Sequence, residues 1–589
     1  MESTKYIGPI KKEKVVSHTL AVGQCFASVS SELSSVTASC EMSHTVVRGK
    51  PNAAQLHLDS VLDAILLEQG IKPSAEARSN VPLAQIMLHC FKQRPNEVFL
   101  SNAGTGKDIT NEQHLKRAIS IARTLTGMGL KGKYAIVEMR NHQETLAVYF
   151  ALIFAGVIPF MMEPNATVYE LTHFLKLVEP SIVFYDGEFE QAMQEATRAC
   201  PELQPVLVAA DQPGVLDNFT KGQSDDIASY RVAERAMDDT VILLPTSGST
   251  GLPKAVILTN RGLTTVLPTI WTYHSRFPTP TRRMMILTTI QWVTFTMFTT
   301  TSVAYHVPIV MTPKAITADH VIEIMEKYRP TWGYLAPAFA VSLVPLIRPD
   351  QLSSFEIMYL LGAPASPTLM GNLKAKMTET ARLCDGYGIT ETHGLIAIPD
   401  KDAPMKSNGW VLNFLNYKIV DDEGQERGRG ENGELWVKGS SVFKGYHKNL
   451  AAYEEAVTPD GWFKTGDEFH LDENERLSYV VRKKITFKHM GAHVSPEEVE
   501  RVICSIPGVH ESVVCPSEKG AVAAVVLLPG ADVTREQIHA VVNSTLSEHK
   551  RLHGGLAFVP SLPHTHSAKL KRNECSKLIE ELIKSGDCY

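Results

Sequence analysis

The run at residues 245–254 constrains this chain more than any other part of its sequence. It reads Pro-Thr-Ser-Gly-Ser-Thr-Gly-Leu-Pro-Lys and follows an apolar stretch, residues 241–244, that is typical of a buried strand. Glycines let backbone N–H groups approach an anion closely, while hydroxyls and a lysine add donors and positive charge. The pattern predicts a strand that ends in a polyphosphate-binding loop, with an ordinary Gly/Ser/Thr surface loop as the alternative. Its spacing differs from that of a P-loop, so it does not imply the P-loop fold.

Helical and strand patterns alternate over most of the chain, which indicates an α/β layered architecture. At 589 residues the chain is too long for one hydrophobic core, so more than one domain is expected. A late β-rich part is predicted near residues 433–439. Residues 482–585 have the pattern of a smaller α+β domain. The short apolar runs that indicate strands earlier in the chain lie at residues 134–137, 181–185, 206–209 and 283–287.

Composition excludes several classes of protein. A hydrophobic content of 44% and a charged content of 21% are those of an ordinary globular protein, and a formal net charge of -6 argues against a nucleic-acid binder. The 9 cysteines are scattered without a CxxC pair or zinc spacing, which indicates reduced thiols in a cytosol-like compartment. The final residues, 586–589, do not form an S-K-L-type peroxisomal address, so a cytoplasmic location is expected.

The segment at residues 145–162 is almost wholly apolar and has the length of a short membrane span. Gly156 and Pro159 interrupt it, however, which favours a buried helix that leads into a buried strand at residues 157–161. No integral membrane segment is therefore expected. Residues 1–77 are rich in Ser, Val and Lys, and are expected to be an N-terminal extension that is either disordered or a targeting segment. Within them, apolar spacing predicts one amphipathic helix at residues 57–69.

Further motifs follow the 245–254 run in order. Tyr387-Gly388-Ile389-Thr390-Glu391 resembles a Y-G-x-T-E motif, and residues 461–467 resemble G-W-x-x-T-G-D. Residues 482–491 resemble a hinge followed by a glycine loop. Lys569 matches a lysine found near the C-terminal end of chains that have these motifs. In this order the motifs resemble the adenylate-forming superfamily, which includes acyl-CoA synthetases, 4-coumarate–CoA ligases, beetle luciferases and non-ribosomal adenylation domains. The resemblance covers about residues 80–585.

The resemblance implies an α/β fold. A large N-terminal adenylation domain of several subdomains would occupy residues 78–480, and a small mobile α+β lid residues 481–589. It also implies that a carboxylic acid attacks the α-phosphorus of ATP, giving an acyl-adenylate and pyrophosphate, with catalysis mainly by positioning and electrostatic stabilisation. ATP, Mg²⁺ and CoA would be the small molecules required.

Roles in the first step follow from the same resemblance. Thr390 would hydrogen-bond the α-phosphate, and Glu391 would hold Mg²⁺, a cation that favours oxygen ligands. Tyr387 would stack on adenine, while Asp467 and Arg482 would contact the ribose. The β- and γ-phosphates would be bound by the loop residues Thr246, Ser247, Gly248, Ser249, Thr250, Gly251 and Lys254. The remaining nucleotide contacts would come from Gly362, Ala363, Pro364, Asp385, Gly386 and Gly388.

Two lysines of the lid would complete the chemistry. Lys569 would bridge the acyl carboxylate and the α-phosphate as charge develops. In the second step the CoA thiol would attack the adenylate after the lid rotates, with Lys488 and Gly491 along the pantetheine path. For each of these residues taken alone, a solvated surface charge or a packing role is the alternative; it is their joint occurrence in order that favours function.

The chain departs from the family pattern at informative positions. The family's carboxylate-orienting His is absent, and Trp292 or Val293 takes its place. The hinge Asp is replaced by Val481, a stiffer residue that is expected to slow the second step. Leu361 stands where relatives often have Gly, so with Trp292 and Phe295 it is expected to shape an acyl pocket for an apolar acid that is not a long straight chain.

These observations favour an ATP-dependent acid–thiol ligase that acts on a fatty or aryl acid. One alternative is an enzyme that stops at the adenylate or loads a carrier protein. Another is a catalytically impaired protein that binds nucleotide or acyl-adenylate, because the motif His and the hinge Asp are missing. A true luciferase is not expected, since Val266 occupies the position of an arginine near luciferin.

Overall fold

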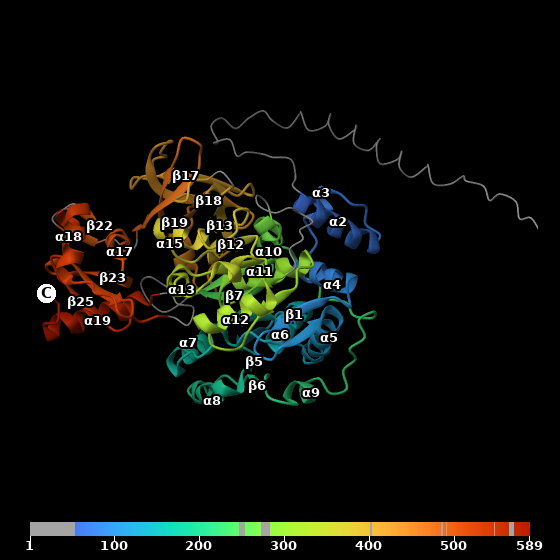
Figure 1. The fold of residues 1–589 in the computed structure, drawn as a ribbon. Helices are drawn as coiled ribbons and strands as arrows, with labels where there is room; N and C mark the ends of the chain where they lie inside the picture. The colour runs from blue at the N-terminus through green and yellow to red at the C-terminus, as the bar shows by residue number, and fades with distance from the viewer. Residues whose placement is uncertain are drawn as a thin grey trace, which may run out of the picture. The chain divides into compact units, whose positions relative to one another are not determined.

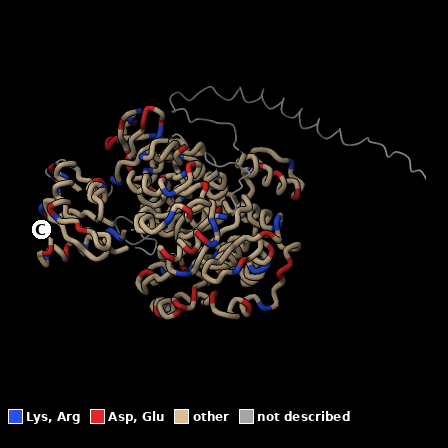
Figure 2. The backbone as a smooth tube through the Cα atoms, viewed as in Figure 1, with Lys and Arg blue, Asp and Glu red and all other residues tan. Residues whose placement is uncertain are grey.

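A computed structural model describes residues 53–246, 254–271, 283–400, 403–483, 487–489, 492–546, 548–564 and 570–588. All of them lie in one compact unit, Gly49–Tyr589. Figure 1 shows the arrangement of the elements along this unit. Basic and acidic residues are interspersed along it (Figure 2).

The first large sheet carries the strand that leads into the phosphate-loop run. Its strands are ordered β6-β5-β3-β4-β7-β8, all parallel except β8, which runs antiparallel to β7. Side chains of a strand alternate in direction, so the apolar strands present side chains on both faces of the sheet. Helices pack on each face and bury them. On β3, Ala135 and Val137 pack with α5 and α6, whereas Ile136 packs with α7 and α8. The bounds are β3 (Tyr134–Glu138), β4 (Ile158–Met161), β5 (Ile182–Tyr185), β6 (Val206–Ala209), β7 (Thr240–Thr246), β8 (Lys254–Thr259), α5 (Asn111–Gly127), α6 (Gln143–Ala155), α7 (Val168–Val178), α8 (Glu190–Arg198) and α9 (Val215–Phe219).

The second large sheet is ordered β13-β12-β11-β9-β10-β1-β2 and is parallel apart from β2. It too is buried on both faces: Trp332 faces the main core, and Leu335 faces a second core with α12, α13 and α15. Its strands are β1 (Val98–Asn102), β2 (Lys107–Thr110), β9 (Met284–Met285), β10 (Ile309–Met311), β11 (Trp332–Leu335), β12 (Ile357–Leu360) and β13 (Arg382–Asp385). The helices of this region are α10 (Asn260–Val266), α11 (Val293–Ala304), α12 (Ala318–Tyr328), α13 (Pro337–Leu343), α14 (Pro349–Leu352) and α15 (Pro367–Lys374).

The apolar segment at residues 145–162 forms a helix and a strand, as predicted. Helix α6 is buried from Thr145 to Ala155, and it ends where Gly156 adopts a left-handed φ of 68° that favours glycine. Strand β4 follows in the middle of the first sheet. No helix within the described ranges is long and apolar enough to cross a membrane.

Two small antiparallel sheets follow, which confirms the predicted late β-rich part. One is β14-β15-β16 and the other β17-β18-β19-β20. Their bounds are β14 (Tyr387–Ile389), β15 (Gly394–Ile398), β16 (Trp410–Val411), β17 (Leu415–Val420), β18 (Asn432–Gly439), β19 (Phe463–Leu471) and β20 (Leu477–Arg482), with α16 (Leu450–Ala456) between β18 and β19.

The C-terminal part is a smaller α+β domain, as expected. Its strands form the sheet β23-β24-β25 and the ribbon β21-β22. Side chains on the two faces of the three-stranded sheet belong to two small cores of their own, one with α17 and α18 and the other with α19. The bounds are β21 (Phe487–His489), β22 (Ala492–Val494), α17 (Pro496–Cys504), β23 (Val509–Ser517), β24 (Gly520–Leu527), α18 (Arg535–Thr545), β25 (Gly555–Phe558) and α19 (Arg572–Ser585).

The helix predicted at residues 57–69 is present as α2 (Ala53–Glu68). Its side chains Leu58, Val61 and Leu62 belong to the main core, together with α4 (Leu83–Gln93). A short helix, α3 (Ala75–Arg78), is attached to α2 through Arg78, whose guanidinium donates two hydrogen bonds of 2.7 Å to Asp63. The packed core of the large domain therefore includes residues that precede position 78.

Candidate functional site

The phosphate-loop run connects two antiparallel strands. Thr246 is the last residue of β7 and pairs with Lys254, the first residue of β8. The ammonium of Lys254 lies 5.0 Å from the centroid of the Tyr446 ring, within range of a cation–π contact. The loop residues Ser247, Gly248, Ser249, Thr250 and Gly251 lie outside the described residues. Thr246 and Lys254, at the two ends of the phosphate-loop run, are therefore held together by strand pairing.

Glu391 lies close to the same tyrosine. It belongs to the short helix η3 (Thr390–Thr392), which follows β14. The Tyr446 hydroxyl donates a 2.9 Å hydrogen bond to Glu391 Oε1, and Phe443 N–H donates to the Glu391 carbonyl at 2.8 Å. Tyr446 thus brings together the residues predicted to hold the phosphates and the metal. Sequence reasoning missed it, although the Gly-Tyr pair was visible in the late β-rich part.

His393 connects its own segment, which follows Glu391, to the end of β8 and to the segment after β18. It is fully buried, its Nε2 accepts a 2.9 Å bond from Thr259 N–H, and its Nδ1–H donates to the Ser441 carbonyl at 2.7 Å. Burial lowers the pKa of His393 to about 4, so the ring is neutral. A Cβ on Gly262 would lie 2.2 Å from His393 Nε2, so only glycine fits there. Sequence reasoning missed His393 as well.

A second cluster forms around Asp467, which is 3% exposed. The Tyr387 hydroxyl donates a 2.6 Å hydrogen bond to Asp467 Oδ2, and the Arg482 Nε lies 3.3 Å from Oδ1. Asp467 and Arg482 are cross-strand partners on β19 and β20, which explains their proximity. Burial and the adjacent Asp467 carboxylate raise the pKa of Tyr387 well above its usual value, so the phenol remains a donor.

Other predicted nucleotide contacts lie at the carboxyl edge of the second sheet. Leu360 on β12 and Asp385 on β13 are paired neighbours, so residues 361–364 and Gly386, which leads into β14, leave the sheet side by side. Gly362 has a φ of 93°. A Cβ on Gly388 would meet the Gly394 carbonyl oxygen at 2.3 Å. Asp385 is buried, and desolvation raises its pKa to about 7.

The predicted acyl-pocket residues occupy apolar surroundings. Trp292 precedes α11 as its N-cap, and Val293, in place of the motif His, is buried at the start of that helix. Phe295 is fully buried and packs edge-to-face on Tyr149, with a centroid distance of 5.8 Å. Leu361 is buried against Gly386, whose Cβ would lie 3.0 Å from Leu361 Cδ2. A substrate-lining role for Phe295 stays a prediction, because the ring is part of the main core.

The structure gives little about the three residues predicted to act from the lid. Gly491 and Lys569 lie outside the described residues, and Lys488 belongs to β21 with its side chain undescribed. The residues on either side of the segment that contains Lys569 are paired with each other. His564 and Leu570 form an antiparallel bridge, and Lys571 N–H donates to the Pro563 carbonyl at 2.9 Å.

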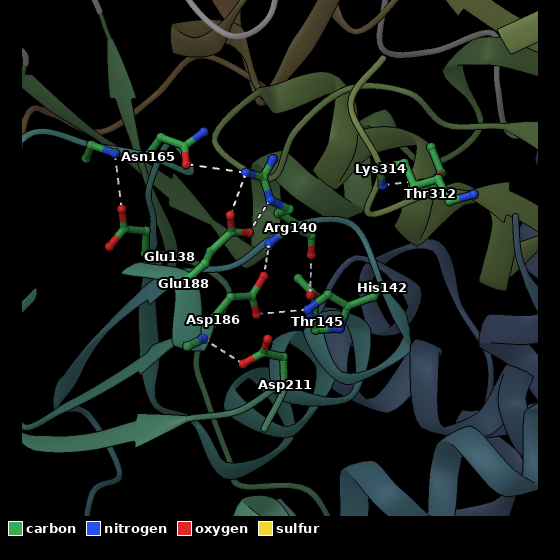
Figure 3. Close-up of polar contacts among 12 residues, drawn as sticks. Glu138, Arg140, His142, Thr145, Asn165, Asp186, Glu188, Asp211, Thr312 and Lys314 are labelled. Carbon is green, nitrogen blue, oxygen red and sulfur yellow. Dashed lines mark hydrogen bonds and ion pairs between the residues drawn. The ribbon is translucent and has the colours of Figure 1, made fainter. Parts of the chain in front are cut away.

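A polar network lies where the loops after β3, β4 and β5 meet (Figure 3). Asp186 accepts bonds from Arg140 N–H at 2.7 Å and His142 Nε2 at 2.9 Å. Arg140 also pairs with Glu188. Glu138 is fully buried, and one of its oxygens accepts from Ala166 N–H at 3.1 Å. Desolvation raises the Glu138 pKa to about 8, so this carboxyl group is mostly protonated at neutral pH.

Two family models match the chain. The AMP-binding enzyme model matches residues 88–447, and the model of the AMP-binding enzyme C-terminal domain matches residues 498–569. Among curated proteins, luciferin 4-monooxygenase of Luciola mingrelica is 28% identical, over 85% of this chain and 95% of the relative. A probable 4-coumarate–CoA ligase of Dictyostelium discoideum is 26% identical, over 83% and 94%.

Solved structures share the fold. ATP-bound MatB from Rhodopseudomonas palustris superposes with a TM-score of 0.76 at 24% identity, covering 86% of this chain and 100% of that one. The anthranilate CoA ligase AuaEII in complex with anthranoyl-AMP gives a TM-score of 0.77 at 20% identity, covering 86% and 98%. The chain therefore belongs to the AMP-binding enzyme family, the adenylate-forming enzymes whose motifs its phosphate loop and its Tyr387 and Asp467 segments resemble.

Proposed function

We propose that this protein activates an apolar carboxylic acid, fatty or aryl, with ATP and transfers the acyl group to CoA. The observation that carries the proposal is the presence of two polar clusters made of motif residues. Lys254 and Glu391 meet at Tyr446. Tyr387 and Arg482 meet at Asp467. The first has the charges needed for a metal and a polyphosphate, and the second has a carboxylate suited to ribose hydroxyls.

In the first step a carboxylate oxygen of the acid attacks the α-phosphorus of ATP. The bond between the α- and β-phosphates breaks, and pyrophosphate leaves. Lys254 and the 246–251 loop bind the β- and γ-phosphates, Thr390 donates to the α-phosphate, and Lys569 neutralises charge that develops at the reacting centre. The Glu391 carboxylate fits a Mg²⁺ ion, because its second oxygen can bind a cation while Oε1 stays on Tyr446. When bound, Mg²⁺ offsets the negative charge of the phosphates.

In the second step the sulfur of CoA attacks the acyl carbonyl as a thiolate. A thioester forms, AMP leaves with the electron pair of the broken acyl–phosphate bond, and the thiol proton is released to solvent. Lys488 and Gly491 line the thiol path. The domain assignment belongs to the same proposal: an adenylation domain ends near residue 480, a lid follows from 481, and residues 1–77 form an extension of which α2 and α3 pack on the large domain.

One observation favours a second candidate, an enzyme that stops at the adenylate. Val481 is 8% exposed and paired with Glu468 inside β20, so the expected hinge is held in a strand rather than in a loop. An enzyme whose lid rotates slowly would accumulate adenylate and release pyrophosphate without transferring the acyl group.

The test is pyrophosphate release by the purified full-length chain with Mg-ATP. A panel of fatty and aryl acids is assayed with and without CoA, and the products are identified by mass spectrometry. CoA-stimulated release with an acyl-CoA product from one acid class supports the proposal. Release that CoA does not change, with bound adenylate, supports the second candidate. No release with any acid, although ATP binds, would contradict both.

Lys569→Ala is expected to lower the rate of adenylate formation by about 100-fold or more, because a transition-state charge loses its partner. Folding should be unaffected if the side chain acts only on the reacting groups, because a substitution away from packed or paired groups usually changes stability within about 0.5 kcal/mol. Lys571→Ala is the matched control: Lys571 pairs with Glu574 at the surface, at 3.2 Å. The measurement is single-turnover formation of acyl-AMP together with thermal unfolding. An unchanged adenylation rate in Lys569→Ala would remove this residue from the mechanism.

A further inference from the structure

Tyr446 is the meeting point of two charged groups that come from distant parts of the chain. Glu391 is 55 residues away in sequence, and its carboxylate accepts the Tyr446 hydroxyl at 2.9 Å. Lys254 begins β8, and its ammonium lies over the Tyr446 ring at 5.0 Å. One side chain therefore contacts a carboxylate through its hydroxyl and an ammonium through its ring.

The backbone fixes where this tyrosine lies. Tyr446 forms an antiparallel bridge with Val256 on β8. On either side of it, Ile257 N–H donates to the Gly445 carbonyl at 3.0 Å, and His447 N–H donates to the Ala255 carbonyl at 2.8 Å. The segment thus lies beside β8 and is paired with it through a single bridge. Gly445 has a φ of 155°, a conformation that favours glycine, so the approach of the chain to β8 depends on that residue.

The hydroxyl of Tyr446 can orient the Glu391 carboxylate by donating a hydrogen bond to it. Its oxygen lies 2.9 Å from Glu391 Oε1, and beside an ionised carboxylate, which can only accept, the phenol O–H is the donor. A donor to one oxygen of a metal-binding carboxylate fixes the rotation of that group, and loss of such partners commonly weakens metal binding by about 10- to 100-fold. The ring separately provides an electron-rich face for the ammonium.

We propose that Tyr446 is a positioning residue that sets the Glu391 carboxylate for the metal and the Lys254 ammonium for the phosphates, through two separable contacts. The inference rests on the proposed function, because it assumes the metal role of Glu391 and the phosphate role of Lys254. It goes beyond that function by predicting that metal and polyphosphate binding are coupled through this side chain, and that the hydrogen bond can be removed while the ring contact is kept.

Two substitutions separate the contacts. Tyr446→Phe keeps the ring under Lys254 and removes the hydrogen bond to Glu391. Tyr446→Leu removes both. Tyr453→Phe is the matched control, since Tyr453 lies in the following helix α16, packs on Phe443 at a centroid distance of 5.4 Å, and contributes to neither contact. Thermal unfolding of each variant checks that the fold is retained.

The measurement is ATP binding by calorimetry, in EDTA and across a Mg²⁺ titration, so that it does not depend on turnover. Tyr446→Phe is expected to bind ATP in EDTA like the wild type, and to need about 10-fold more Mg²⁺ for its tight-binding state. Tyr446→Leu is expected to show the same metal defect and also about 3-fold weaker ATP binding in EDTA, because a cation–π contact is lost. Tyr453→Phe should match the wild type in both.

Glu391→Gln distinguishes failure of the inference from failure of the proposed function. If Glu391→Gln needs more Mg²⁺ but Tyr446→Phe does not, the positioning role is overturned and the function stands. If wild type and Glu391→Gln have the same Mg²⁺ dependence, the metal role of Glu391 is wrong and the inference falls with it. A Tyr446→Phe variant that is weakened equally in EDTA and in Mg²⁺ would also overturn it, because the hydroxyl would then serve the nucleotide rather than the metal.

Discussion

Single buried ionisable groups hold the segments of the candidate site in place. His393 accepts from Thr259 and donates to Ser441, so it connects the end of β8, the η3 turn and the segment after β18. On β3 of the same large sheet, Glu138 holds the loop after β4 through Ala166 N–H. Both groups are neutral at pH 7 because burial disfavours their charged forms. Their protonation links the stability of the site to pH in opposite directions.

His393 is expected to make the fold sensitive to acid. Its pKa is lowered from 6.5 to about 4, so its stabilising contribution is present above pH 6.5 and is lost as the pH falls toward 4. The stability advantage of the wild type over His393→Gln, which has no titrating ring, should shrink by about 3 kcal/mol over that range. Urea unfolding at several pH values measures it. A difference that stays constant with pH would contradict the assignment.

Glu138 is expected to behave in the opposite sense. Its pKa is raised from 4.5 to about 8, so its contribution is fully present below pH 4.5 and is lost as the pH rises toward 8. Glu138→Gln, which resembles the protonated acid, should therefore be more stable than the wild type by about 4 kcal/mol at pH 8, by about 1 kcal/mol at pH 5, and by less at lower pH. The same unfolding experiment tests this, and a gain that is larger at pH 5 than at pH 8 would refute it.

At the scale of elements, an ion pair anchors the helix that follows Lys569. Arg572 begins α19, and its guanidinium donates bonds of 2.9 and 2.8 Å to the two oxygens of Glu500 on α17. Glu500 also accepts from Val514 N–H at 2.8 Å, which adds β23 to the connection. The ends of the segment that contains Lys569 are therefore set by the lid's own sheet and helices.

Arg572→Met should destabilise the lid. It leaves the buried Glu500 carboxylate without its cation, and breaking a buried pair from one side costs about 3 kcal/mol. Hydrogen exchange of the β23 and α17 amides measures this local loss, and those of the first large sheet should be unchanged. The double variant Arg572→Met/Glu500→Gln should recover part of the protection, because no buried charge is left unpaired. Equal loss in single and double variants would argue against the pair.

At the scale of the whole molecule, the lid has cores of its own and joins the large domain after β20. The expected hinge residue, Val481, lies within β20 opposite Glu468, and the next pair along the strand is Arg482 with Asp467. Rotation of the lid would therefore have to begin after Arg482 or to open the end of this strand. A β-branched residue favours the strand and so resists opening.

Val481→Asp is expected to speed thioester formation more than adenylation, because Asp has a low strand propensity and lets the end of β20 open. It should also lower the unfolding free energy by about 1–3 kcal/mol, since a charged group replaces a buried apolar one beside Glu468. Val481→Thr, which keeps the β-branch, serves as the control. Single-turnover assays of each half-reaction measure the ratio of the two rates. Equal changes in both rates would exclude a hinge role for this position.

Features of the fold that depend on local patterns were predictable from the amino-acid sequence. The strand at residues 241–244, the buried helix and strand at 145–162, the late β-rich part and the α+β lid all form where periodicity and glycine positions indicated. The order of the motifs also indicated the family, which the matched family models confirm. Local hydrophobic spacing and turn chemistry are sufficient for such features because they act between near neighbours.

The contacts between distant side chains could not be predicted in the same way, because they depend on the tertiary fold. Tyr446 reaches Glu391 across 55 residues of chain, and His393 reaches Thr259 across 134. Val481, the position predicted to be a stiffened hinge, lies in a paired strand opposite Glu468. The packing of α2 into the main core was equally invisible in its local pattern, which fits a free amphipathic helix as well. These contacts depend on how sheets and helices pack over long chain separations, and local propensity carries no information about that packing.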